Sequence, residues 1–262
     1  MEGPMGFLDA RADAPHRPSP QQLSNPDAGV LYLRSYLLMR AVIGFVGLAL
    51  PVLLVLGDVA LEGGKLLGSL SEYFYTGMRD VFVGALCVTG LFLLTYKVFE
   101  RHLDNLLSTV AGVAALGVAL FHTDRPKGST IPLTPLQERL GEAPVAAVHY
   151  TCAAVFIVSL GVISLYFGLS EGKRTELTGR LSPTFWRRFH FTCAAGIGVA
   201  VVFIAITELS GRFDDYSLII GETLAILSFG ASWLMKGLEL RVLLGPKPAE
   251  EPLEAQEAAT AG

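Results

Sequence analysis

Long apolar runs, separated by short polar stretches, dominate the pattern of the chain. Each run holds about 17 to 25 residues, the length needed to cross the hydrocarbon core of a bilayer. The runs lack the strict alternation of barrel strands, and helices satisfy their own backbone amides in lipid. The sequence therefore predicts an all-α transmembrane bundle of six spanning helices, at Ser35–Leu56, Arg79–Tyr96, Leu106–His122, Val145–Gly168, Phe189–Leu209 and Leu218–Leu240.

The two ends of the chain differ from this central region. Residues 1–25 are rich in Pro, Asp and Arg and contain no apolar core of a signal peptide. Residues 245–262 carry several glutamates. We expect two disordered tails around a membrane domain that extends from 26 to 244.

Composition agrees with the pattern. Hydrophobic residues make up 52% of the chain, charged residues 17%, and the mean hydropathy is +0.50. The net charge of −4 says little about partners, and nothing in the chain suggests binding to nucleic acid. All three cysteines fall inside apolar runs, so buried thiols are expected in place of disulfides. A homo-oligomer is compatible with the sequence.

The distribution of Lys and Arg predicts the orientation of the bundle. With the N-terminus inside, the inner segments hold 14 of these residues and the outer segments hold 6. Positive residues are retained on the cytoplasmic side, so both termini are expected in the cytoplasm. Anionic lipid headgroups are the expected partners of the basic loop residues Lys173, Arg174, Arg187 and Arg188. Lys236 is expected to be another positive anchor at this surface, and His190 to lie at the membrane interface.

Ionisable residues gather at the opposite, outer end. Such groups are costly at membrane depth and usually face a protein interior or a water-filled cavity. In the predicted topology, distant parts of the sequence bring six of them to one level: Asp80, His122, Asp124, His149, Glu208 and Glu222. The candidate ligand-binding residues are Arg79, Asp80, His122, His149 and Glu222, together with Ser71, Tyr73 and Tyr75 from the segment before the second span.

Several of these residues have simpler interpretations. Arg79 and Asp80 are adjacent and could mark the end of a span, and Tyr73 and Tyr75 fit the aromatic belt of a membrane surface. The two histidines could form ordinary hydrogen bonds. Alternatively, His122 and His149 could bind zinc together with a carboxylate, Asp80 or Glu222, since imidazole and carboxylate are common zinc ligands. Glu222 follows three apolar residues, which favours a buried functional or pairing role.

Common functional motifs are absent from the sequence. There is no phosphate-binding loop, dinucleotide fingerprint, His-Glu-x-x-His pair, Cys pair with zinc spacing or Gly-x-Ser-x-Gly elbow. There is also no voltage sensor and no potassium-type filter. These absences argue against energy-coupled pumps and the commonest channels, and no catalytic residue is predicted.

Two resemblances accompany this interpretation. The segment 69–84, SLSEYFYTGMRDVFVG, and the segments around Gly221–Thr223 and 229–237 resemble uncharacterised bacterial integral-membrane proteins with six helices. This resemblance implies a location in a bacterial inner membrane. A looser resemblance is to the ceramidase and adiponectin-receptor superfamily of membrane hydrolases, which implies Ser, Asp and His around zinc. Ser71, Asp80, His122 and His149 match those residue types, but the chain has neither seven helices nor the final His-x-x-x-His pair.

Three functions follow as hypotheses. The first is a non-energised membrane protein whose outer-leaflet pocket binds a small polar ligand, an ion or a lipid headgroup. The second is a zinc-dependent hydrolase of lipid or amide bonds, in which the metal would activate a water molecule. The third is a structural subunit in which the polar cluster forms internal ion pairs. The sequence favours a binding protein over an enzyme.

Overall fold

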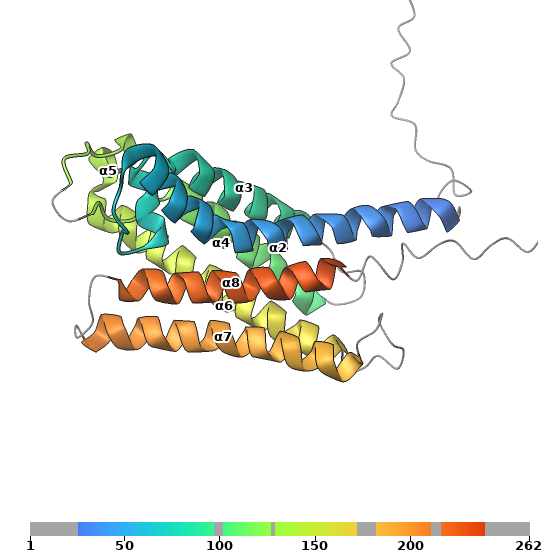
Figure 1. Cartoon of the computed structure of the whole chain (residues 1–262). Helices are drawn as coiled ribbons and strands as arrows, with labels where there is room; N and C mark the ends of the chain where they lie inside the picture. The colour runs from blue at the N-terminus through green and yellow to red at the C-terminus, as the bar shows by residue number, and fades with distance from the viewer. Residues whose placement is uncertain (1–25, 97–101, 127–128, 172–181, 211–215, 239–262) are drawn as a thin grey trace, which may run out of the picture. The chain divides into compact units, whose positions relative to one another are not determined.

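The computed structural model describes residues 26–96, 102–126, 129–171, 182–210 and 216–238, and all their regular structure is helical. Both expected tails, 1–25 and 245–262, lie outside these residues. Figure 1 traces the elements in chain order. They are α2 (Pro26–Glu62), η1 (Leu70–Tyr75), α3 (Arg79–Thr95), α4 (His102–Leu120), α5 (Pro135–Leu140), α6 (Glu142–Glu171), α7 (Pro183–Ser210) and α8 (Ser217–Leu238).

The chain divides into two compact units, Met1–Tyr36 and Leu37–Gly262. The described part of the first unit is the opening of α2, a helix that continues through Pro51. All contacts discussed below lie within the second unit.

Within the described ranges, four helices are long and apolar enough to cross a membrane, at Ser35–Glu62, Glu142–Glu171, Pro183–Ser210 and Ser217–Leu238. Large apolar side chains stand exposed along them, such as Phe45 at 63% and Val199 at 62%. Exposing this apolar surface would cost free energy in water, whereas contact with lipid tails would not. The chain is therefore a multi-pass membrane protein.

The other two predicted spans correspond to α3 and α4, which are shorter. α3 has 17 residues, and the apolar part of α4 covers Asn105–Leu120. At 1.5 Å per residue α3 is about 26 Å long, near the lower limit for crossing a bilayer. Crossing by these two helices, and hence the six-span topology and its orientation, remains a prediction.

Close helix contacts hold the second unit together. α6 packs on both α4 and α7, α3 packs on α4, and α7 packs on α8. The part of α2 within this unit contacts α8 through glycines: a Cβ on Gly44 would meet the backbone of Leu234, and one on Gly230 would lie 2.7 Å from the amide nitrogen of Leu48. Small residues permit such close backbone approach where lipid supplies no hydrophobic drive for association.

The connections between helices carry their own local structure. Gly63 ends α2 with a φ of 63°, the left-handed conformation that glycine adopts without strain. The predicted outer loop from Thr123 to Pro144 contains the short helix α5. Thr134 and Gln137 form a capping box at the start of that helix.

Candidate functional site

The segment that connects α2 to α3 is fixed to the start of α8. The Ser69 side chain caps η1 by accepting a hydrogen bond from the amide of Ser71. The Leu70 amide donates to Oε2 of Glu222 at 2.6 Å, and the Ile219 amide donates to the Gly68 carbonyl at 2.8 Å. We define the η1 end as the end of the bundle that holds η1, the last residues of α4 and α7, and the first residues of α3, α6 and α8.

His149 of α6 connects two other elements at the η1 end. Its Nδ1 lies 2.7 Å from the Phe121 carbonyl oxygen, and its Nε2 lies 3.0 Å from Oγ of Ser71. A carbonyl oxygen can only accept, so Nδ1 carries a proton, and in the neutral ring Nε2 keeps its lone pair. Ser71 therefore donates its hydroxyl hydrogen to Nε2. Both residues are buried, with Ser71 6% and His149 2% exposed.

A second buried network surrounds Tyr75. Its hydroxyl donates to the Thr123 carbonyl at 2.6 Å and accepts from Nε2 of Gln137 at 2.7 Å. Burial raises the pKa of Tyr75 and of the neighbouring Tyr73 above the ordinary value. Tyr75 thus joins the α2–α3 segment to α5. Gln137 was not identified from the sequence, and its place three residues after Thr134 was the only signal for it.

His122 and Arg79 both contact Phe74. The His122 ring lies 4.0 Å from the Phe74 ring, and its Nδ1 lies 3.3 Å from Oγ1 of Thr134. Nε of Arg79 donates to the Phe74 carbonyl at 3.0 Å, and its guanidinium carbon lies 4.5 Å from the centre of the Phe74 ring. Arg79 and Asp80 are exposed. Among the described residues, no ion pair joins Arg79 to Glu222.

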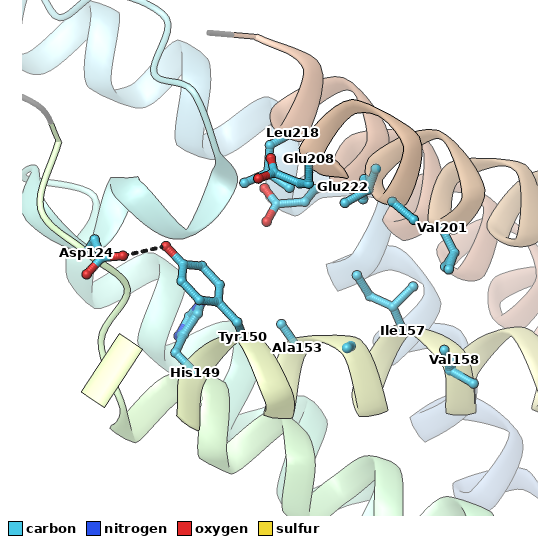
Figure 2. A pocket seen from close by; sticks show the side chains of 13 residues that line it. Asp124, His149, Tyr150, Ala153, Ile157, Val158, Val201, Glu208, Leu218 and Glu222 are labelled. Carbon is cyan, nitrogen blue, oxygen red and sulfur yellow. Dashed lines mark hydrogen bonds between the residues drawn. The ribbon is translucent and has the colours of Figure 1, made fainter. Parts of the chain in front are cut away.

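A cavity of about 550 Å³ opens between α6, α7 and α8. Most of its wall is apolar, formed by Ala153, Ala154, Ile157, Val158, Val201, Ile204, Ala205 and Leu218. Its polar lining consists of Asp124, His149, Tyr150, Glu208 and Glu222. Figure 2 shows the polar side chains at one end of the cavity, where the Tyr150 hydroxyl donates to Oδ2 of Asp124 at 3.1 Å. Among the described residues that line it, none is Lys or Arg.

The candidate residues from the sequence therefore fall into three groups. His149 and Glu222 line the cavity. Ser71 is hydrogen-bonded to His149. Tyr73 and Tyr75 are buried residues of η1, and His122 contacts Phe74 of η1. Arg79 and Asp80 lie on the exposed surface. Asp124 and Glu208, also noted among the outer ionisable groups, both line the cavity, Asp124 from the connection after α4 and Glu208 from α7.

The described residues contain no group of three or more His, Cys, Asp or Glu side chains placed to hold a metal ion. Both ring nitrogens of His149 already have hydrogen-bond partners. A metal bound there would have to displace either Ser71 or the Phe121 carbonyl. Zinc binding by His122, His149 and Asp80 remains a prediction from residue types.

A buried ionic cluster lies at the ends of α6, α7 and α8 opposite the η1 end. The sequence did not predict it. Lys236 was expected to be a surface anchor, and His190 to lie at the interface. Instead, Lys236 of α8 pairs with the fully buried Glu171 of α6, and His190 is fully buried against Ser232. Lys236 and Glu171 lie 65 positions apart, and each stands at the end of an apolar run. Charges that anchor a helix at the membrane surface occur at the same place, so the sequence does not distinguish the two roles.

Arg40 of α2 lies beside this cluster. Its guanidinium carbon is 4.7 Å from the centre of the Phe167 ring and within 6 Å of the rings of Tyr96 and Trp233. The rings thus contact the charge through their electron-rich faces. Of the predicted lipid contacts, Arg187 and Arg188 are exposed at the start of α7, whereas Lys173 and Arg174 lie outside the described residues.

Comparison with known proteins gives no relative for this chain. No family model matches it, and neither a curated protein nor a solved structure matches it significantly.

Proposed function

We propose that the protein binds one amphiphilic molecule of the bilayer, with its polar head at the η1 end of the α6–α7–α8 cavity. The proposal rests on the uneven distribution of polar and apolar side chains over the cavity wall. Five polar side chains are gathered at one end, and apolar side chains form the remainder. A ligand with one polar and one apolar part matches this division, whereas a free ion would leave the apolar part empty.

The charges of the lining favour a particular kind of head. Asp124, Glu208 and Glu222 are acidic, and the tautomer of His149 leaves an acceptor nitrogen directed at Ser71. Carboxylates bind ammonium and hydroxyl groups, and they repel phosphate unless a cation intervenes. We therefore propose a head that carries an amine or several hydroxyl groups. In the predicted topology this head lies in the outer leaflet.

The experiment measures binding to the purified protein in detergent. Single-chain lipids with amine, glycerol or sulfate heads are titrated, and complexes are counted by native mass spectrometry. We expect saturable binding of one amine- or glycerol-headed molecule and none of the sulfate-headed lipid. Glu222→Gln should weaken binding about 10- to 100-fold, because a hydrogen bond to a charged group contributes about 1.5 to 3 kcal/mol.

Two further variants define the site. Ala153→Phe fills the cavity from α6 and should abolish binding, whereas Glu138→Gln alters an exposed carboxylate on α5 and should leave it unchanged. Equal binding by wild type, Glu222→Gln and Ala153→Phe would show that the lipid sits elsewhere. Asp80→Asn separately tests the prediction that Asp80 takes part in ligand binding from its exposed position.

A further inference from the structure

The strongest chemical arrangement in the described structure is the buried pair of Ser71 and His149. Ser71 donates its hydroxyl hydrogen to Nε2 of His149 across 3.0 Å, within the distance required for proton transfer. The Phe121 carbonyl holds the opposite ring nitrogen at 2.7 Å and fixes the tautomer. A nucleophile, a base and a group that orients the base are the three parts of an activated serine.

We propose that Ser71 is a nucleophile activated by His149, and that it accepts the acyl group of an ester-linked lipid bound in the α6–α7–α8 cavity. This inference rests on the proposed binding function, because His149 is the residue that the pair and the cavity share. Ser71 itself lies next to the cavity wall: the amide of the preceding residue, Leu70, donates to Glu222, another lining residue.

The local structure holds the serine in place. Ser71 lies in η1, and its own amide donates to Oγ of Ser69. The Ile219 amide binds the Gly68 carbonyl just before this turn. These contacts join the turn to α8 while His149 approaches from α6. The pair is therefore positioned by contacts from separate helices, which limits its freedom before any substrate binds.

The orienting group indicates the substrate class. Phe121 presents a neutral carbonyl where serine hydrolases of the Ser-His-Asp type present a carboxylate. A neutral acceptor stabilises the imidazolium less than a carboxylate does, so this base suits the more reactive carbonyl of an ester better than that of an amide. A single-chain carboxylic ester with an amine or polyol head has a polar part and an apolar part that fit the cavity, and a carbonyl that the Ser71–His149 pair could attack.

The proposed reaction consumes one water molecule and changes no oxidation state. Oγ of Ser71 bonds to the ester carbonyl carbon while its proton moves to Nε2 of His149. The carbon–oxygen bond to the head group breaks, and His149 gives the proton to the departing alcohol oxygen. Water, deprotonated by His149, then attacks the acyl-serine. A fatty acid leaves, and the proton returns to Oγ.

A buried serine that merely satisfies a histidine nitrogen would form the same hydrogen bond, so the test must detect nucleophilicity. The full chain is reconstituted in lipid nanodiscs and treated with an alkyl fluorophosphonate. A reactive Oγ displaces fluoride from phosphorus and leaves a stable adduct. We expect one adduct per chain, located by mass spectrometry on the peptide containing Ser71. An adduct on another residue, or no adduct, overturns the proposal without need of any variant.

Variants separate the base from the nucleophile. Ser71→Ala should lose the adduct completely. His149→Gln keeps a side chain that can donate and accept but removes the base, and should slow labelling by about 100-fold or more. Ser164→Ala, which alters a fully buried serine of α6, is the matched control and should label as wild type does. Labelling of folded Ser71→Ala at the wild-type rate contradicts the proposal.

The same preparations distinguish failure of this inference from failure of the binding function. Binding of an amine-headed, non-hydrolysable ether lipid is measured on the wild type and on Ser71→Ala. If both bind and neither is labelled, the cavity binds a lipid and Ser71 is not a nucleophile. If the wild type fails to bind, both proposals are wrong. Wild-type binding with Ser71-specific labelling, and release of fatty acid from the matching ester, supports both.

Discussion

At the scale of single residues, burial of Tyr75 has a consequence for stability in alkaline solution. Its hydroxyl is hydrogen-bonded on both sides, and burial raises the pKa of Tyr75 above the value of about 10 that it has when unfolded. The folded state therefore holds the proton more tightly than the unfolded state. The corresponding stability is complete below pH ~10 and is lost as the pH rises through the folded pKa.

We predict that the thermal midpoint in detergent falls above pH ~10 and that Tyr75→Phe falls less steeply. The variant should start from a lower midpoint, because Gln137 and the Thr123 carbonyl lose a partner at neutral pH. Tyr216→Phe, which alters an exposed tyrosine, should retain the wild-type alkaline profile. Parallel pH profiles of wild type and Tyr75→Phe would contradict the assignment.

The ion pair of Lys236 with Glu171 makes the second prediction at this scale. Glu171 is fully buried, so removing Lys236 takes away an ion pair that offsets the burial of its carboxylate. Lys236→Met should cost about 3 kcal/mol of unfolding free energy, the usual cost of breaking a buried pair. Adding Glu171→Gln should restore most of this loss, because a neutral amide then replaces the buried carboxylate. Denaturant unfolding measures both.

The control for this pair is Lys65→Met, which removes an exposed cation from the α2–α3 connection and should change stability little. If Lys236→Met lowered the unfolding free energy no more than Lys65→Met does, Lys236 would be a surface anchor, as the sequence suggested. His190 would then also lie nearer the surface than the structure places it.

At the scale of elements, the contact between α2 and α8 depends on the absence of side chains. Gly44 and Gly230 leave no room for a Cβ: one on Gly230 would lie 2.9 Å from the Gly44 carbonyl oxygen. Because these neighbours are backbone atoms, relief would require the helices to separate. We predict that Gly44→Ala and Gly230→Ala each destabilise the protein by about 1 to 3 kcal/mol, measured by thermal unfolding in detergent.

Two glycines of the same bundle provide the matched control. A Cβ on Gly84 of α3 or Gly198 of α7 would meet no atom within 4 Å. Alanine has the higher helix propensity, so Gly84→Ala and Gly198→Ala should be neutral or stabilising by up to about 1 kcal/mol. Destabilisation of the same size in all four variants would mean that packing between α2 and α8 is not the cause.

How far the fold could be predicted also depends on the elements. The positions of the long apolar helices follow from hydropathy alone, and Glu142–Glu171 and Pro183–Ser210 enclose the predicted fourth and fifth spans. The short elements η1 and α5 have six residues each and lie between spans. Their existence depends on capping by Ser69 and on the Thr134–Gln137 box, signals weaker than a hydrophobic run.

The partners of each polar residue were harder to predict. That His149 and Glu222 share a depth follows from their places near the starts of their helices. That His149 binds Ser71, and that Lys236 binds Glu171, depends on the rotation of each helix about its axis. Spans that are apolar on every side leave this rotation open, because no polar face distinguishes the interior from lipid.

At the scale of the whole molecule, the remaining question is whether α3 and α4 cross the membrane. They are consecutive, so the positions of both termini and of the α5 region relative to the bilayer are the same with four spans or six. Only the connection between α3 and α4 differs. With six spans it is cytoplasmic, as its basic residues Lys97 and Arg101 predict, and with four it stays outside.

Thiol accessibility distinguishes the two topologies. In a chain whose three cysteines are replaced by alanine, Lys97→Cys is treated with a membrane-impermeant maleimide, first in intact cells and then after permeabilisation. Six spans predict labelling only after permeabilisation, because the polar reagent cannot cross the bilayer. Thr130→Cys, on the predicted outer side, should be labelled in intact cells, and Ser182→Cys, on the inner side, should not. With both controls as expected, labelling of Lys97→Cys in intact cells would reduce the bundle to four spans and leave α3 and α4 as a hairpin packed outside the bilayer core.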